Sequence, residues 1–279
     1  MSETVHQLLH QAYRVLAGVE TARLDAELLL ACVLGARRET LYAHPEREVP
    51  EIMIGAFRKM IDERRMLQPV AYLTGRREFW SLDLKVNPDT LIPRPESELL
   101  VAAALERIPE QAAWRLLDLG TGCGAIALAI AAERPRCEVY ATDISQAALT
   151  IAESNRKAYH LQNVHLRQAD WLNGFAEEPF HMILSNPPYL ASDDAALHEG
   201  ETRFEPRLAL DGGEGGLERI RQIIPSAGVF LEFGGYLLLE HGCDQGAAVR
   251  SLLSASGYRD PVSLCDLAGH ERVSLGQSA

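Results

Sequence analysis

The chain has 279 residues, 47% hydrophobic and 24% charged, which is the composition of a globular protein with one large or two modest domains. Its 27 basic and 39 acidic residues give a formal net charge of −12, which repels phosphate backbones and argues against stable nucleic-acid binding. The five cysteines lack CxxC spacing, and no stretch approaches the ~20 apolar residues of a membrane span, so we expect a reduced, cytoplasmic protein with no membrane association.

Residues 1–68 are expected to form a small helical domain. Apolar residues recur at helical spacing between Leu8 and Leu16, good helix formers run from Asp25 to Ala31, and Pro50 opens another helical segment. The positive charge clustered between Arg58 and Arg77 fits either a solvated helix face or a local basic patch. Because these helices carry no chemical constellation, we expect a partner-binding or capping domain.

Residues 69–93 are expected to form a β-hairpin linker, since apolar and polar residues partly alternate there between Gly and Asn-Pro signals. From residue 94 to 279 helical and strand patterns alternate, which predicts an α/β domain with a parallel sheet covered by helices on both faces. The expected helices cover residues 97–107, 125–133 and 145–159, and the expected strands cover 114–119, 138–142, 164–167, 182–185 and 235–240.

A Gly-rich turn joins the strand at 114–119 to the helix at 125–133. Its glycines let the chain turn sharply and let a ligand approach the backbone, at the sheet edge where ligands bind. The spacing of the glycines fits two classes of cofactor. Ala125 completes a dinucleotide-binding pattern, whereas Asp118 and Gly124 complete a pattern that binds S-adenosylmethionine. A turn that binds no ligand is the third interpretation. The expected cofactor-binding residues of this turn are Asp118, Gly120, Thr121, Gly122, Cys123 and Gly124.

Three further side chains are expected to bind the adenosine part of the cofactor. Asp143 ends the next strand, where a carboxylate accepts the ribose hydroxyls of either cofactor class, or alternatively caps the helix near Ser145. Asp170 is expected to accept a hydrogen bond from the adenine amine. Trp171 stacks on the adenine ring in one interpretation and packs into the core in the other.

The tetrapeptide Asn186-Pro187-Pro188-Tyr189 follows an apolar strand and decides the chemistry. Two prolines fix the backbone, so the Pro187 carbonyl and the Asn186 side-chain oxygen both become acceptors, while Tyr189 offers an aromatic face. A planar NH₂ is a poor nucleophile, and two acceptors orient it toward an activated methyl group. A hydride-transfer enzyme has no use for such a pocket. We therefore expect methyl transfer to an amide or amino nitrogen, with a purely structural turn as the alternative.

At these residues the chain resembles the amino-methyltransferases with an Asn-Pro-Pro-Tyr motif, which include adenine-N6 and cytosine-N4 DNA methyltransferases. Its flanking sequence resembles the PrmC/HemK family of release-factor glutamine methyltransferases more specifically. Ser97 is a small departure, because family members often have Thr there. The resemblance rests on Asp25–Leu30, Gln68–Gly75 with Phe79-Trp80, Leu91–Glu98, Asp118–Gly124, Asn186–Tyr189, Glu205-Pro206 to Leu217, and Glu240–Gly242.

The resemblance implies a helical N-terminal substrate-recognition domain (1–68), a β-hairpin linker (69–93) and a Rossmann-like class I methyltransferase domain (94–279). The implied cofactor is S-adenosyl-L-methionine, released as S-adenosyl-L-homocysteine. The implied substrate is the glutamine of the Gly-Gly-Gln motif of bacterial peptide-chain release factors, and a monomer is expected. The alternatives are a ribosomal-protein glutamine methyltransferase and an adenine-N6 or cytosine-N4 nucleic-acid methyltransferase. By this likeness Asn186, Pro187 and Tyr189 are catalytic, and Asn186 also binds the cofactor. The glutamine binds Asn186, Pro187, Pro188 and Tyr189.

The nine histidines form no set with metal-ligand spacing, so we expect no metal site. His241, beside Glu240, is interpreted as a structural residue at a strand end rather than as a catalytic one.

Overall fold

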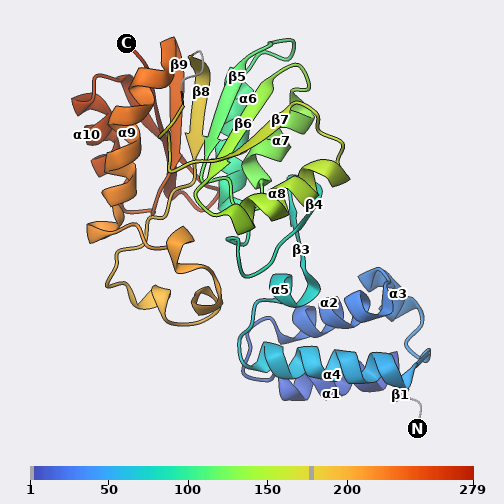
Figure 1. Ribbon diagram of the computed structural model, residues 1–279. Coiled ribbons are helices and arrows are strands. Elements are labelled where there is room, and N and C mark those ends of the chain that lie inside the picture. Colours follow the sequence, from blue (N-terminus) through green and yellow to red (C-terminus); the bar gives the residue numbers. More distant parts are fainter. Residues whose placement is uncertain (1–2, 176–178) are drawn as a thin grey trace. The chain divides into compact units, whose positions relative to one another are not determined.

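The computed structural model describes residues 3–175 and 179–279 (Figure 1). Residues 1–2, which belong to the expected helical domain, and residues 176–178 lie outside this description. The chain divides into two compact units, residues 1–76 and residues 77–279. Within the described ranges, the structure contains no helix with both the length and the apolar character needed to cross a membrane.

The first unit is a helical bundle, as its sequence pattern predicts. A capping box between Thr4 and Gln7 begins its first helix, satisfying two backbone N–H groups. The apolar stripes bury Leu8, Leu30 and Phe57 in one common core. Its elements are β1 (Glu3–Thr4), α1 (Val5–Val15), α2 (Ala22–Leu34), α3 (Arg38–Ala43), β2 (Glu48–Val49), α4 (Glu51–Arg65) and α5 (Val70–Thr74).

The hairpin is shorter than the sequence pattern indicates. Only β3 (Arg76–Phe79) and β4 (Leu82–Lys85) pair, whereas residues 70–74 at the start of the expected hairpin form helix α5. The Thr74 hydroxyl donates to the Val70 carbonyl at 3.0 Å, and Gly75, at φ 72°, ends the helix in the left-handed conformation. Apolar–polar alternation over so few residues does not separate a single helical turn from a strand.

The second unit is built on a seven-stranded sheet in the order β10-β11-β9-β8-β5-β6-β7. Its first half contains η1 (Pro95–Ser97), α6 (Glu98–Arg107), β5 (Arg115–Leu119), α7 (Ala125–Glu133), β6 (Glu138–Asp143), α8 (Gln146–Ala158), β7 (Val164–Gln168) and β8 (Phe180–Ser185). The second half contains the short turns η2 (Ala195–Leu197), η3 (Thr202–Phe204), η4 (Arg207–Ala209) and η5 (Glu214–Gly216), then α9 (Glu218–Phe230), β9 (Leu231–Glu240), α10 (Gly246–Ala255), β10 (Arg259–Cys265) and β11 (Glu271–Gln277).

The predicted α/β fold with a mostly parallel sheet is confirmed, and the sheet departs from the parallel arrangement only at β11. Strand β11 runs antiparallel to both of its neighbours, β9 and β10. The tight turn between β10 and β11 makes this possible, because a short connection joins only antiparallel strands. The elements α9, α10, β10 and β11 were not anticipated individually.

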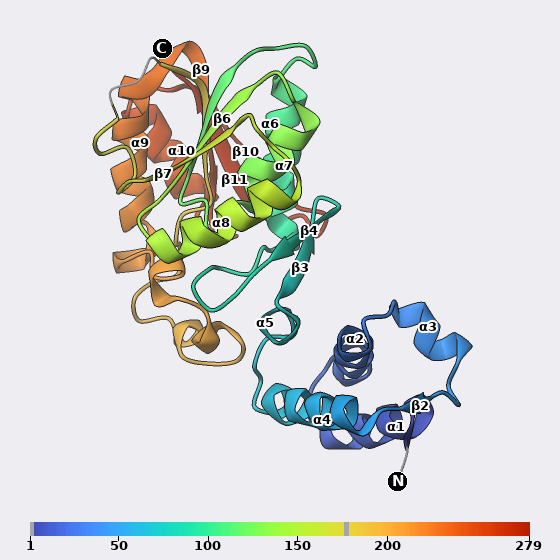
Figure 2. The ribbon, with the colours of Figure 1, turned by 45° about the vertical axis from the view of Figure 1, so that its right-hand side comes forward.

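Helices cover both faces of the sheet. Side chains alternate along each strand, so Leu117, Ile183 and Leu237 point to one face, where they pack with Ile220 of α9 and Val249 of α10. Helices α6, α7 and α8 cover the opposite face (Figure 2). This two-sided burial explains why the central strands are almost continuously apolar.

Candidate functional site

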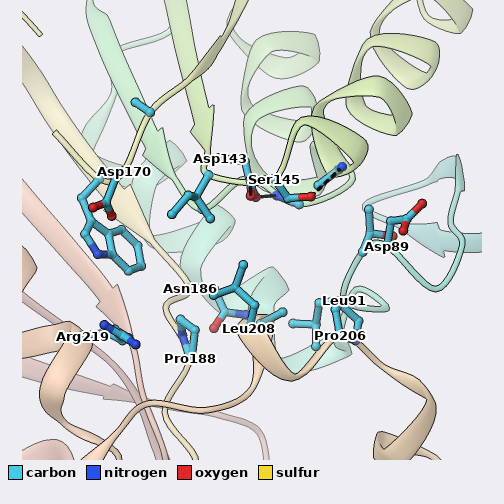
Figure 3. A pocket seen from close by; sticks show the side chains of 18 residues that line it. Asp89, Leu91, Asp143, Ser145, Asp170, Asn186, Pro188, Pro206, Leu208 and Arg219 are labelled. Atoms are coloured by element: carbon cyan, nitrogen blue, oxygen red, sulfur yellow. Dashed lines mark hydrogen bonds between the residues drawn. The ribbon is translucent and has the colours of Figure 1, made fainter. Parts of the chain in front are cut away.

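The order in which the chain adds strands to the sheet reverses between β5 and β8, although the two strands are parallel. From β5 the chain proceeds to β6 and β7 on one side, then returns to place β8 on the other side of β5. In the parallel pairing Leu119 lies opposite Ser185, so the Gly-rich turn and Asn186 leave adjacent strand ends. Ligands of open α/β sheets bind in the crevice at such a reversal. A cavity of about 280 Å³ lies there (Figure 3).

The Gly-rich turn forms one wall of the cavity. Gly120 and Gly122 line it with φ values of 71° and 56°, a region that L side chains rarely adopt. A Cβ on Gly122 would meet nothing within 4 Å, so its backbone is open to a ligand. A Cβ on Gly124, by contrast, would lie 3.0 Å from Leu128, which explains this third glycine by helix packing rather than by ligand contact.

Asp143 holds the turn in place. Its Oδ2 accepts the Gly122 N–H at 2.9 Å, and its Oδ1 accepts the Ser145 N–H at 2.8 Å. The Ser145 side chain, not Asp143, caps α8 through the Ala148 N–H. Burial raises the pKa of Asp143 above its usual value, against the backbone hydrogen bonds that lower it. Each carboxylate oxygen keeps a second lone pair, so this carboxylate can also accept ribose hydroxyls.

Asp118 lies beneath the turn rather than in the cavity. Its Oδ2 accepts the Thr121 hydroxyl at 2.7 Å, while its buried Oδ1 has no hydrogen-bond partner in the described structure. Burial raises its pKa to about 7. An orphaned buried carboxylate oxygen beneath an open glycine turn fits the ammonium group at the methionine end of an S-adenosylmethionine molecule. The expected residues Thr121, Cys123 and Gly124 also do not line the cavity.

Trp171 combines the two roles that its sequence context left open. Its ring lines the cavity, with Cζ3 3.6 Å from the position of a Cβ on Gly120. The same side chain packs, partly buried, against the core cluster that contains Leu172. Asp170 also lines the cavity and lies exposed at its rim (Figure 3). A flat aromatic wall with a carboxylate beside it suits a purine ring that carries an amine.

Asn186 projects into the cavity opposite Asp143 (Figure 3). Its Nδ2 donates to the Ser97 hydroxyl at 3.1 Å, which leaves Oδ1 as the acceptor available to a ligand. Pro188 also lines the cavity, whereas Pro187 and Tyr189 are not among its lining residues. Tyr189 is partly buried, and burial together with the charge of Glu240 raises its pKa to about 12.

Glycines outside the Gly-rich turn shape the loop of Asn186 to Tyr189. A Cβ on Gly212 would lie 2.6 Å from the Pro188 carbonyl oxygen, and a Cβ on Gly216 would lie 2.2 Å from the Tyr189 carbonyl oxygen. Any side chain at either position would displace this backbone. The run Gly212 to Gly216 is visible in the sequence, but its packing partner is not.

The remaining wall comes from residues that sequence reasoning did not assign to the site. Glu205, whose side chain is fully buried, accepts the Ile92 N–H at 3.0 Å and forms an ion pair with Arg94. This contact joins two chain segments that together line the far side of the cavity. The unassigned lining residues are Asp89, Thr90, Leu91, Ile144, Ser145, Ala148, Ala169, Pro206, Leu208, Ala209 and Arg219. Ile144 and Ser145 were signalled only by their position directly after Asp143.

His241 makes structural contacts. Its Nδ1 lies 2.8 Å from the Gly242 carbonyl and its Nε2 lies 2.8 Å from the Ser274 hydroxyl, and burial lowers its pKa. It does not line the cavity.

Two family models match the chain. Residues 7–75 match the PrmC N-terminal domain, and residues 96–204 match the methyltransferase small domain. A methyltransferase of known structure from Pyrococcus furiosus superposes with a TM-score of 0.54 over 71% of this chain and 89% of its own, at 19% identity, which supports the fold.

Two proteins named release factor glutamine methyltransferase match nearly the whole chain. The protein of Pseudomonas aeruginosa is 50% identical over 93% of this chain and 94% of its own. The protein of Escherichia coli strain K12 is 45% identical over 96% of this chain and 97% of its own. With this identity over almost the full length, the chain belongs to the family of release factor glutamine methyltransferases.

Proposed function

We propose that this protein transfers a methyl group to the side-chain amide nitrogen (N5) of the glutamine in the Gly-Gly-Gln motif of peptide-chain release factors. The observation that carries the proposal is the placement of Asn186. Its amide nitrogen is engaged by Ser97, so its oxygen is presented to a cavity that ends at the Gly-rich turn. An oxygen acceptor at that point suits the two hydrogens of a planar NH₂.

S-adenosyl-L-methionine is the cofactor, and the residues of the cavity fit it. Gly120 and Gly122, with Asp118 beneath them, would hold its methionine end, Asp143 would hold its ribose, and Trp171 with Asp170 would hold its adenine. When bound it supplies a methyl group on a positively charged sulfur, and it leaves as S-adenosyl-L-homocysteine.

The chain's own residues act on the glutamine. The Asn186 oxygen and the Pro187 carbonyl accept the two amide hydrogens, which directs the nitrogen toward the Gly-rich turn. The nitrogen uses its electron pair to form a bond to the methyl carbon, and the bond from that carbon to sulfur breaks with its electron pair left on sulfur. The nitrogen becomes positive, and these two acceptors stabilise the developing charge. One of the held hydrogens then leaves as a proton to water, and no strong base is needed because the positively charged nitrogen is acidic. Tyr189 supports the loop beside this position.

We further propose that the chain works as three parts. Residues 1–68 recognise the release factor, residues 69–93 connect, and residues 94–279 bind the cofactor and perform the chemistry. The match of residues 7–75 to an N-terminal domain that accompanies this family supports the first assignment. Hydrogen exchange of the full chain with and without release factor tests it. Protection within residues 5–65 is expected, and protection confined to the second unit would contradict it.

The protein is proposed to act as a cytoplasmic monomer without stable nucleic-acid binding. All five cysteines are free, and Cys32, Cys243 and Cys265 are exposed, which fits a reducing compartment. The net charge of −12 opposes binding to phosphate backbones. Sedimentation of the purified chain, alone and with a duplex or a structured RNA, tests both statements. A stable dimer, or a complex with nucleic acid at ~150 mM salt, would contradict them.

The decisive experiment supplies the chain with radiolabelled cofactor and a release factor. Label is expected on the glutamine of Gly-Gly-Gln, located by mass spectrometry, and a release factor with asparagine in place of that glutamine is the matched control. Label on DNA, RNA or a ribosomal protein, with none on the release factor, would reject the proposal in favour of that acceptor.

The same assay tests the role of Asn186. Replacing it by Ala removes one of the two acceptors and is expected to lower kcat about 100-fold, the effect of losing one preorganised hydrogen bond to developing charge. Cofactor affinity, measured by calorimetry, is expected to change little. Near-normal turnover in Asn186→Ala would show that the side chain does not hold the amide.

A further inference from the structure

Two buried side chains, Ser97 and Glu240, lie behind Asn186, outside the cavity. Ser97 lies in η1, directly before α6, and is 3% exposed. Glu240 ends β9 and is 1% exposed. Ser185 pairs with Leu239 across β8 and β9, so Asn186 and Glu240 are the next residues on adjacent strand ends. Neither Ser97 nor Glu240 lines the cavity.

The hydroxyl of Ser97 accepts a hydrogen bond from Asn186 Nδ2 at 3.1 Å. The buried Glu240 carboxyl lies near the same hydroxyl: burial raises the pKa of Glu240, and the nearby Ser97 hydroxyl lowers it. A serine hydroxyl has one hydrogen and two lone pairs. Once it accepts from Asn186, its single hydrogen can go to Glu240. An ionised carboxylate can only accept hydrogen bonds. It therefore favours a Ser97 hydroxyl that donates toward Glu240 and accepts from the Asn186 amide.

We propose that Ser97 and Glu240 are positioning residues, and that the ionised Glu240 carboxylate, acting through Ser97, holds the Asn186 amide with its oxygen toward the substrate nitrogen. The two ends of an asparagine amide have almost the same shape, so packing alone does not choose between them. A rotation of the amide by half a turn would present an NH₂ group to the substrate NH₂, donor against donor. This proposal rests on the proposed function of the site.

When Glu240 is protonated, it no longer fixes which groups donate and which accept between Glu240, Ser97 and Asn186. A neutral carboxyl can donate to Ser97, and the Ser97 hydrogen is then free to donate to a rotated Asn186 oxygen. Burial raises the pKa of Glu240 to about 7, so this change falls near neutral pH. The Oε2 atom of Glu240 has no hydrogen-bond partner among the described residues, which is consistent with a carboxyl retained for a purpose other than stability.

The charged and titratable groups around Glu240 come from three elements. Arg94 directly precedes η1, Glu96 lies within it, Arg272 lies on β11, and Tyr189 follows β8. Glu96 opposes ionisation of Glu240, while Arg94 and Arg272 favour it. The two arginines are themselves paired, Arg94 with Glu205 and Arg272 with Asp266 at 3.0 Å. Neither is a dedicated counter-ion, so burial remains the leading influence on the Glu240 pKa.

We call the arrangement of Asn186, Ser97 and Glu240 the relay. Kinetics of the full chain with release factor and cofactor test it. Glu240→Gln, whose amide can donate or accept, and Ser97→Ala are each expected to lower kcat about 10- to 100-fold, the loss of a charge-assisted hydrogen bond. The KM for the release factor and the cofactor affinity are expected to stay within about two-fold. Ser97→Thr, which restores a hydroxyl, is expected to recover most of the activity. Ser251→Ala removes an exposed hydroxyl on α10 and is the matched control.

The pH profile separates positioning from a merely structural role. Wild-type kcat is expected to fall about ten-fold per pH unit below the Glu240 pKa and to be level above it. In Glu240→Gln the profile is expected to be flat between about pH 6 and 8. An unchanged profile in Glu240→Gln, or full activity of Ser97→Ala, would overturn the relay while leaving the proposed function intact.

A measurement without substrate covers the case in which the wild type methylates no release factor. The side-chain NH₂ signals of Asn186, assigned by their loss in Asn186→Ala, are followed by nitrogen-15 NMR from pH 6 to 8. The relay predicts that they shift with the Glu240 titration and that Ser97→Ala abolishes the shift. Signals that ignore both changes would refute the relay independently of any activity, and the pair of results would distinguish its failure from that of the proposed function.

Discussion

Replacing Glu205 by Ala tests whether one buried contact shapes the substrate side of the cavity. The Glu205 side chain is fully buried, accepts the Ile92 N–H at 3.0 Å, and pairs with Arg94, whose side chain is 30% exposed. These partners lie more than a hundred residues away along the chain. The substitution therefore leaves a buried N–H without an acceptor and an arginine with access to water.

The burial of Glu205 and the partial exposure of Arg94 determine the expected loss in the free energy of unfolding. Breaking a buried ion pair costs roughly 3–5 kcal/mol, and partial solvation of Arg94 recovers some of that, so we expect about 3 kcal/mol of destabilisation. For a unit of this size that lowers Tm by roughly 6–12 °C. Glu205→Gln keeps an oxygen for Ile92 and loses only the charge, with an expected cost of about 1 kcal/mol.

Chemical unfolding, calorimetry of cofactor binding and steady-state kinetics check this together. Because Pro206 and Leu208 line the substrate side of the cavity, Glu205→Ala is expected to raise KM for the release factor while leaving cofactor affinity near that of the wild type. Arg207→Ala, which removes the exposed pair with Asp211 in the same loop, is the control and is expected to cost less than about 1 kcal/mol. If Glu205→Ala unfolds within about 0.5 kcal/mol of the wild type, the buried contact does not hold the loop and the reasoning fails.

Three further changes have definite expected outcomes. Asp143→Ala removes the acceptor of two backbone N–H groups and the proposed ribose contact, and is expected to weaken cofactor binding about 10- to 100-fold in calorimetry; unchanged affinity would exclude the ribose contact. The raised pKa of Glu240 means that its ionisation opposes folding, so wild-type stability from this group decreases as pH rises from about 4.5 to about 7. Glu240→Gln is therefore expected to be more stable than the wild type at pH 8, by up to about 3 kcal/mol, and equal to it near pH 4.5 in urea unfolding; a less stable variant at pH 8 would contradict this. Arg64→Ala leaves the buried Asp25 carboxylate, now 2.7 Å from the arginine Nε, without its ion-pair partner, and is expected to cost roughly 3–5 kcal/mol of the stability of the first unit; a loss below 1 kcal/mol in thermal unfolding would show that water replaces the partner.

Local patterns predicted the central elements well. Helix α7 spans Ala125–Glu133, the range expected from the sequence, because a glycine turn starts it and a continuous apolar segment fills it. The strand before it ends at Leu119, as expected. Residues 70–74 form a helix within the expected hairpin. The sequence pattern did not predict this helix because five residues contain too little periodicity to distinguish a helix from a strand.

The function of several residues was visible only in the folded chain. Trp171 could be core or cavity wall from its sequence, and its position over Gly120 makes it both. Asn186 was recognisable by its motif, but its hydrogen bond to Ser97, 89 residues earlier, was not. The antiparallel β11 likewise has no signature in a single strand, because strand direction is a property of a pair.

The sequence by itself determined the α/β alternation, the glycine turn, the tetrapeptide at 186–189 and, through these, the class of reaction. Each of those depends on backbone freedom, side-chain chemistry or periodicity within a few neighbouring residues. Only the tertiary structure decided that the buried Glu240 carboxyl lies behind Asn186. It also decided that the ion pair between Glu205 and Arg94 joins the segments on the far side of the cavity. Both are contacts between segments far apart in the chain, and their energies exist only once burial has removed the competing water.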